Sequence, residues 1–159
     1  INLFTYSPKY QLPETLFVYY IDETEDKIKL SKIVAKQKGL KIININHLEK
    51  KQNKNSRIKL SVENWLKCFY YAKYIVTDSF HGCLFSIIFN KEFIVYGNEE
   101  RGMARFNHLL LQYNLKDRLI MNSSMYKEMT IKSNLPSENQ IIINRESGIR
   151  YLQTYLQNV

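Results

Sequence analysis

Short apolar runs alternate with segments of helical periodicity along this chain, and that alternation limits the fold more than any other feature. Nearly continuous apolar runs are typical of strands covered on both faces in a parallel sheet. Helices joining such strands imply right-handed crossovers, so we expect an α/β domain with a doubly wound parallel sheet and helices on both faces. The expected strands cover residues 16–21, 40–46, 74–77 and 93–97.

Capping residues place the ends of the expected helices. Asp22 stands three residues before Glu25, as in a capping box, and Gly39 follows the lysines that end the helix expected over 23–38. Ser61 is a good cap for a second helix that ends near Lys73. Asp78-Ser79 opens a short apolar helix. A further helix carries Phe106, Leu109, Leu110 and Tyr113 on its inner face.

Length and composition favour one globular domain over residues 1–159, since 45% of the residues are apolar and 24% are charged. We expect an irregular lead-in at 1–14, a basic surface loop at 47–60, a polar loop at 120–139 and a terminal helix over 146–157. The chain begins at Ile1 without an initiator Met, which suggests a piece of a longer protein.

The composition also indicates where the protein is located and what kind of partner it binds. Two cysteines are too few for a disulfide scaffold, and no apolar run reaches the length of a membrane span. We therefore expect a soluble, cytoplasmic protein. The formal net charge of +8 favours anionic partners without saying which anion.

The segment Thr77-Asp78-Ser79-Phe80-His81-Gly82 places four chemically useful residue types where a strand turns into a helix. Ligands of open α/β sheets bind outside the carboxyl ends of the strands, and a helix amino terminus favours anions. Ser79, Phe80, His81 and Gly82 are therefore candidates for holding a phosphate or a carboxylate. The simpler alternative is that Asp78 or Ser79 only caps the helix and that His81 is structural.

Arg101 and Arg105 flank a glycine after the last expected strand and form the second candidate. Two guanidinium groups can bind an anion bidentately. The alternative for Arg101 is a surface ion pair with Glu99 or Glu100.

Other chemistries find little support. Three histidines without clustered cysteines or carboxylates do not predict a metal site. Neither GxGxxG nor GxxxxGK[ST] occurs, so dinucleotide and P-loop sites are not expected. Cys83 has no base placed beside it by the sequence. The 47–60 run lacks aromatic residues, so nucleic acid is not an expected partner, although a basic nucleic-acid-binding module stays open as a minor alternative.

Residues 61–118 resemble the polysaccharide pyruvyl transferase family. The resemblance rests on T-D-S-F-H-G at 77–82, followed about twenty residues later by R-G-x-x-R-F at 101–106. Cys83 and Glu92 depart from the family's usual residues. The resemblance implies a two-domain, GT-B-type architecture of which this chain is the Rossmann-like carboxyl-terminal half, with the amino-terminal half missing.

The resemblance also implies an activity: transfer of a pyruvyl group from phosphoenolpyruvate to sugar hydroxyls of a surface or exported polysaccharide, giving a pyruvate ketal. His81 would act in acid-base chemistry or contact phosphate, with Asp78 orienting it, and Arg105 and Arg101 would bind the donor's anionic groups. No cofactor is implied.

The implied partners are phosphoenolpyruvate and a glycan or lipid-linked sugar acceptor. The resemblance is also compatible with peripheral membrane association of the full-length protein. A GT-B-type glycosyltransferase or sugar-nucleotide epimerase half is the alternative, because it too binds an anionic donor.

Overall fold

The computed structural model describes residues 14–45, 61–99, 102–128, 131 and 134–157. Five parallel strands form one sheet in the order β2-β1-β3-β4-β5. The strands are β1 (Thr15–Tyr19), β2 (Lys41–Asn44), β3 (Tyr74–Thr77), β4 (Glu92–Tyr96) and β5 (Leu119–Ile120).

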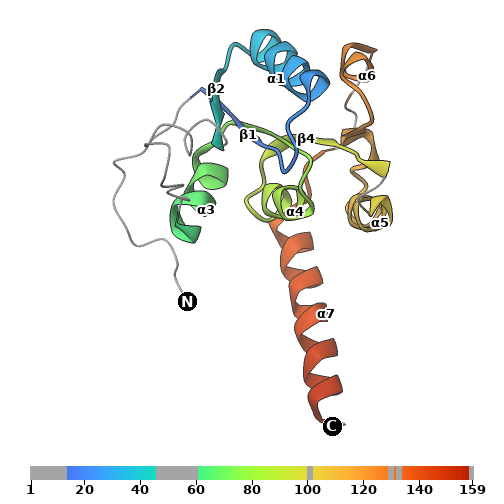
Figure 1. Ribbon diagram of the computed structural model, residues 1–159. Coiled ribbons are helices and arrows are strands. Elements are labelled where there is room, and N and C mark those ends of the chain that lie inside the picture. Colours follow the sequence, from blue (N-terminus) through green and yellow to red (C-terminus); the bar gives the residue numbers. More distant parts are fainter. Residues whose placement is uncertain (1–13, 46–60, 100–101, 129–130, 132–133, 158–159) are drawn as a thin grey trace, which may run out of the picture.

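Helices cover both faces of the sheet, which confirms the predicted α/β fold class (Figure 1). On one face lie α1 (Glu25–Lys38) and α6 (Ser123–Glu128). On the other lie α3 (Val62–Tyr71), α4 (Phe80–Ile88) and α5 (Met103–Gln112). The long helix α7 (Glu138–Gln157) extends away from the sheet.

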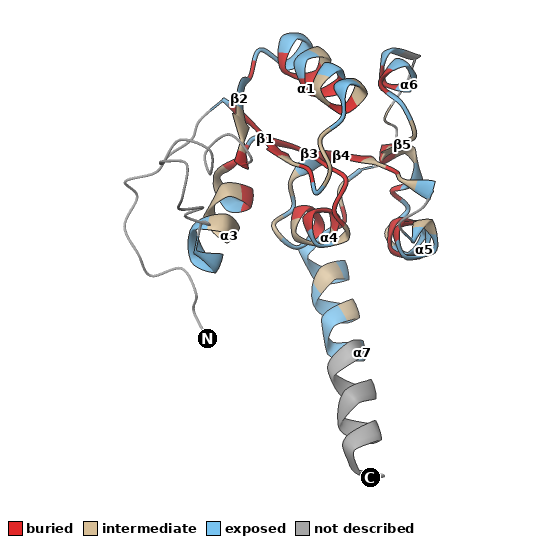
Figure 2. Cartoon of the chain, in the orientation of Figure 1, coloured by how far each residue is buried: buried red, intermediate tan, exposed pale blue. Residues whose placement is uncertain are grey.

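Alternate side chains of each central strand enter two separate hydrophobic cores, one on each face. Leu16 and Val18 of β1 pack with α1, whereas Phe17 packs with α3 and α4, and all three are at most 1% exposed. Figure 2 shows the resulting band of buried residues through the middle of the sheet. A strand buried on both faces explains why these runs are apolar at every position.

Several boundaries differ from the sequence prediction. Thr24, not Asp22, caps α1, because its side chain accepts a hydrogen bond from the N–H of Lys27. The segment 120–139, expected to be a polar loop, contains the end of β5, all of α6 and the start of α7. Strand β5 has only two residues, too few to produce a periodic signal. Nearly all of 1–14 and all of 47–60 lie outside the described residues.

The first turn of α1 is tied to α6 by one carboxylate. Asp26 accepts hydrogen bonds from the backbone N–H and the hydroxyl of Ser123 and from the hydroxyl of Tyr96. Burial alone would raise the pKa of Asp26, but the bonds from Ser123 and Tyr96 outweigh it and lower the pKa below its ordinary value of 3.8.

A carboxyl group whose pKa is lower in the folded state stabilises the fold above its unfolded-state pKa, and that stability is lost as the pH falls through the folded-state pKa. Asp26→Asn should therefore cost stability at about pH 6 and progressively less towards about pH 3. Urea unfolding of both proteins across this range measures the difference. A difference that does not change with pH would contradict this account of Asp26.

The strand order reverses between β1 and β3. The chain runs from β1 outward to β2 on one side and then returns to place β3, β4 and β5 on the other. The carboxyl ends of β1 and β3 therefore flank the topological switch point, where open α/β sheets bind their ligands.

Candidate active site at the sheet's switch point

The turn after β3 is bound to the end of β1 by two side chains. The hydroxyl of Thr77 donates to the carbonyl of Tyr19 (2.7 Å) and accepts from the N–H of Ser79 (3.1 Å). The carboxylate of Asp78 accepts from the N–H groups of Ile21 (2.7 Å) and Asp22 (3.3 Å). These bonds fix the β3–α4 turn directly beside the β1–α1 turn.

A buried lysine completes this connection. The ammonium group of Lys27 donates to Asp78 Oδ2 (2.6 Å) and to the carbonyl of Asp22 (2.8 Å). Both side chains of the Lys27–Asp78 ion pair are 4% exposed. The Lys27 nitrogen also lies 5.8 Å and 5.4 Å from the ring centroids of Tyr20 and Tyr96, within cation–π range.

Sequence reasoning missed Lys27. The available signal was its position three and seven residues before Leu30 and Val34, on the stripe of α1 that faces the sheet. Lysine is almost never fully buried without a partner, so a lysine on an apolar stripe predicts a buried carboxylate nearby.

The carboxylate of Asp78 has partners other than His81, and its role in orienting His81 stays a prediction. Its carboxylate is occupied by Lys27 and by two backbone N–H groups of the β1–α1 turn. Among the described residues, no hydrogen bond joins Asp78 to His81. The structure places Asp78 in the architecture of the turn, because a buried carboxylate needs these donors to offset the loss of water.

Ser79 and Gly82 also have structural partners. Ser79 is buried, and its hydroxyl accepts from the N–H of Gly82 (3.3 Å), so it caps α4 as the simpler interpretation held. A Cβ on Gly82 would lie 2.3 Å from the hydroxyl oxygen of Thr77. Gly82 is therefore required for α4 to pack on Thr77, whether or not a ligand approaches.

His81 and Arg105 come from different helices, and each lies near the ring of Phe80. The Phe80 ring centroid lies 6.1 Å from the His81 ring and 5.3 Å from Cζ of Arg105. Its ring also contacts Phe106 edge-on at 5.9 Å, which anchors it to α5. His81 and Arg105 are both exposed, unlike Asp78 and Ser79.

The backbone adds donors at the same place. Phe80 and His81 are the first two residues of α4, whose N–H groups precede the first intrahelical hydrogen bond. Within the described part of the chain, no protein group accepts from either N–H. An imidazole, a guanidinium and two backbone N–H groups therefore lie near the half-buried Phe80 ring, and groups of these kinds bind small anions.

The second predicted arginine, Arg101, lies outside the described residues. Gly102 follows it and caps α5 in the left-handed conformation (φ 76°), which a side chain rarely adopts. A glycine at this position lets the chain turn sharply into the helix that carries Arg105.

Neither cysteine has the properties of a nucleophile. Burial raises the pKa of Cys83 to about 12, and it raises the pKa of Cys68 as well. A thiol is reactive as its thiolate, so Cys83 is inert in the folded protein. Across the described residues, no three His, Cys, Asp or Glu side chains group as metal ligands would.

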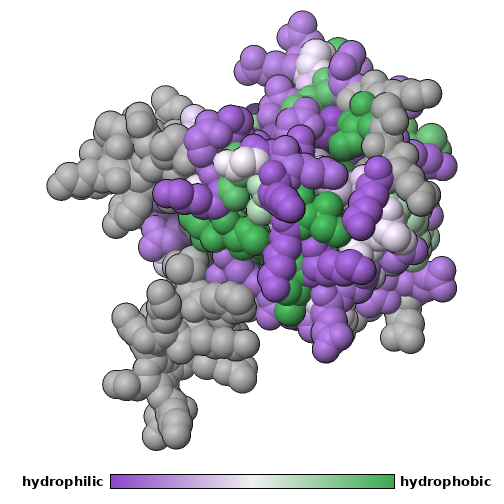
Figure 3. Space-filling view, turned by 90° about the horizontal axis from the view of Figure 1, so that it is seen from above, coloured by the Kyte–Doolittle hydropathy of each residue, from purple (hydrophilic) through white to green (hydrophobic). Residues whose placement is uncertain are grey.

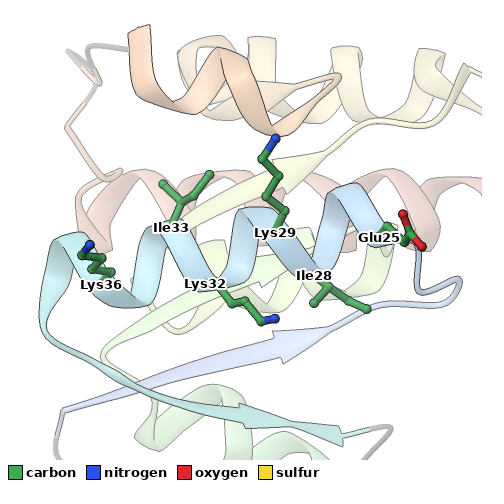
Figure 4. A pocket seen from close by; sticks show the side chains of 6 residues that line it. All are labelled: Glu25, Ile28, Lys29, Lys32, Ile33 and Lys36. Carbon is green, nitrogen blue, oxygen red and sulfur yellow. The ribbon is translucent and has the colours of Figure 1, made fainter.

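A separate hollow of about 440 Å³ lies on the outer surface of α1. Because α1 covers the opposite face of the sheet from α4 and α5, this hollow is distinct from the His81–Arg105 site. Figure 3 shows the molecule from above relative to Figure 1, and on this face hydrophilic residues separate smaller hydrophobic patches. Figure 4 shows the six lining residues, all from α1: Glu25, Ile28, Lys29, Lys32, Ile33 and Lys36.

Comparison with known protein families identifies the family of this chain. The sequence profile of the polysaccharide pyruvyl transferase family matches residues 6–100, more than half of the chain. The chain belongs to the polysaccharide pyruvyl transferase family. No curated protein and no solved structure gives a significant match.

Family membership confirms the resemblance predicted from the sequence. The match includes the T-D-S-F-H-G turn but ends before Arg101 and Arg105. The case for Arg105 therefore rests on its position beside Phe80. In the described part of this family member, none of the helices has the length and apolar character needed to span a membrane.

Proposed function

We propose that this chain binds phosphoenolpyruvate between His81 and Arg105 and serves as the donor-binding half of a pyruvyl transferase. The observation that carries the proposal is that two exposed side chains, His81 of α4 and Arg105 of α5, both lie near the Phe80 ring, which is at the start of α4. Phosphoenolpyruvate carries a phosphate and a carboxylate, so it needs more than one cationic or N–H donor group. Family membership supports the choice of reaction.

In this proposal Arg105 binds one anionic group of the donor through its planar guanidinium, and the first N–H groups of α4 bind the other. His81, as the imidazolium, gives a proton to the methylene carbon of the enol. The carbon that bears the phosphate then develops positive charge and is attacked by a sugar hydroxyl, whose proton passes to a base. The bond between this carbon and the phosphate oxygen then breaks and inorganic phosphate leaves. A second hydroxyl attacks the same carbon and loses its proton to a base, which completes the ketal.

The acceptor is a pair of hydroxyls on a glycan or lipid-linked sugar. We assign its binding to parts of the protein other than the His81–Arg105 site, since the donor would occupy that site. Asp78 and Ser79 stay outside the proposed donor contacts because Lys27, the β1–α1 turn and Gly82 occupy them.

Thermal unfolding with millimolar ligands tests the donor class, because a ligand that binds only the folded state raises its stability. We expect phosphoenolpyruvate to raise the melting temperature more than inorganic phosphate does. UDP and a UDP-sugar should have no effect. A shift with the UDP compounds alone would replace this proposal with a glycosyltransferase-like donor site.

A further inference from the structure

The Lys27–Asp78 ion pair lies at the topological switch point, between the carboxyl ends of β1 and β3. It is also almost fully enclosed, with both side chains 4% exposed. Burying two charges is expensive, and apolar residues of similar volume often do as well or better for stability alone. The location of the pair therefore calls for a reason beyond stability.

The contacts of Lys27 supply that reason. Its ammonium group reaches one partner on each side of the switch point: the carbonyl of Asp22 after β1 and the carboxylate of Asp78 after β3. Asp78 is three residues before His81, with only the Ser79 cap and Phe80 between them. Any shift of the Asp78 carboxylate is passed to the first turn of α4, because Ser79 and Gly82 are held to the same turn.

We propose that Lys27 is a positioning residue of the donor site. By bonding both turns at once, it fixes the start of α4 against the end of β1, and so sets where the His81 imidazole and the first α4 N–H groups lie. Lys27 does not touch the donor. This inference rests on the proposed function, since it concerns the same site.

The chain offers a control at the amino-terminal ends of the strands, opposite the ends that carry the candidate site. Arg118 is 1% exposed and pairs with Glu92 (2.8 Å), which is the first residue of β4. Arg118 immediately precedes β5, so this second buried cation lies at the amino ends of the strands. Replacing it removes a buried cation from an ion pair, here one whose carboxylate is 46% exposed, without touching the turn that carries His81.

The experiment compares Lys27→Met with Arg118→Met, at a temperature where both are folded. We expect Lys27→Met to weaken phosphoenolpyruvate binding by about tenfold to a hundredfold, the cost of misplacing a binding group by about 1 Å. Arg118→Met should leave the affinity within about twofold. Equal losses in the two variants would mean that Lys27 acts only through stability and would overturn the inference.

Hydrogen exchange separates this inference from the proposed function, because it needs no ligand. Lys27→Met should speed exchange at the amides of Gly82 and Cys83, which are hydrogen bonded to Ser79 in the first turn of α4, more than Arg118→Met does. If the wild-type protein fails to bind phosphoenolpyruvate, the proposed function is wrong. Faster exchange in Lys27→Met would still support the positioning role of Lys27, and unchanged exchange would refute that role. Should Lys27→Met not fold, Lys27→Gln keeps a hydrogen-bond donor without the charge and is judged by the same comparisons.

Discussion

Replacing Asp78 with alanine is expected to destabilise the protein by about 3–5 kcal/mol, because the change leaves Lys27 charged and buried without its carboxylate. The backbone N–H groups of Ile21 and Asp22 lose an acceptor as well. Domains of this kind have a total stability of about 5–15 kcal/mol, so the loss is a large part of it. Urea unfolding followed by circular dichroism measures the change.

An exposed ion pair provides the control. Glu63 and Lys67 pair at 2.7 Å along α3, with side chains 72% and 31% exposed. Glu63→Ala should change stability by no more than about 1 kcal/mol, since solvent screens such pairs. The account of the switch point would be wrong if Asp78→Ala were as mild as Glu63→Ala.

The second large effect is on catalysis. His81→Ala is expected to lower pyruvyl transfer by about a hundredfold to ten-thousandfold, the usual contribution of a general acid. The same change should leave stability within about 0.5 kcal/mol, because His81 is exposed and its described contact is one ring contact with Phe80. Steady-state transfer from phosphoenolpyruvate in the full-length enzyme, together with an unfolding curve, tests both statements.

His108 is the natural comparison, since it is an exposed histidine on α5, the helix that carries Arg105. His108→Ala should retain nearly normal transfer. A His81→Ala enzyme that turns over like His108→Ala would remove His81 from the mechanism.

Local sequence patterns predicted most of the fold. The apolar runs of β1, β3 and β4 and the Ser61 and Ser79 caps correspond to elements of the structure because each depends on a few neighbouring residues. Strand β5 and helix α6 could not be predicted in this way. They are held by distant partners, such as the hydrogen bonds between Ser123 and Asp26 across 97 positions of the chain.

The sequence predicts where the candidate residues lie along the chain but not which partners their side chains have. The density of polar residues identified the turn after β3. Which of these residues have structural partners depends on contacts with β1 and α1. Only the structure shows that Asp78 turns toward Lys27, 51 residues earlier, and that Gly82 packs on Thr77. His81 is the polar side chain of that turn that remains exposed.

The most direct test of the central claim is nuclear magnetic resonance of the histidine rings during a phosphoenolpyruvate titration. The chain has three histidines, at 47, 81 and 108, and the His81→Ala variant identifies the signal of interest. We expect a saturable shift of the His81 signal, a smaller shift with inorganic phosphate, and a His108 signal that stays in place. Saturation of the protein with phosphoenolpyruvate while the His81 signal stays unchanged would contradict the central claim.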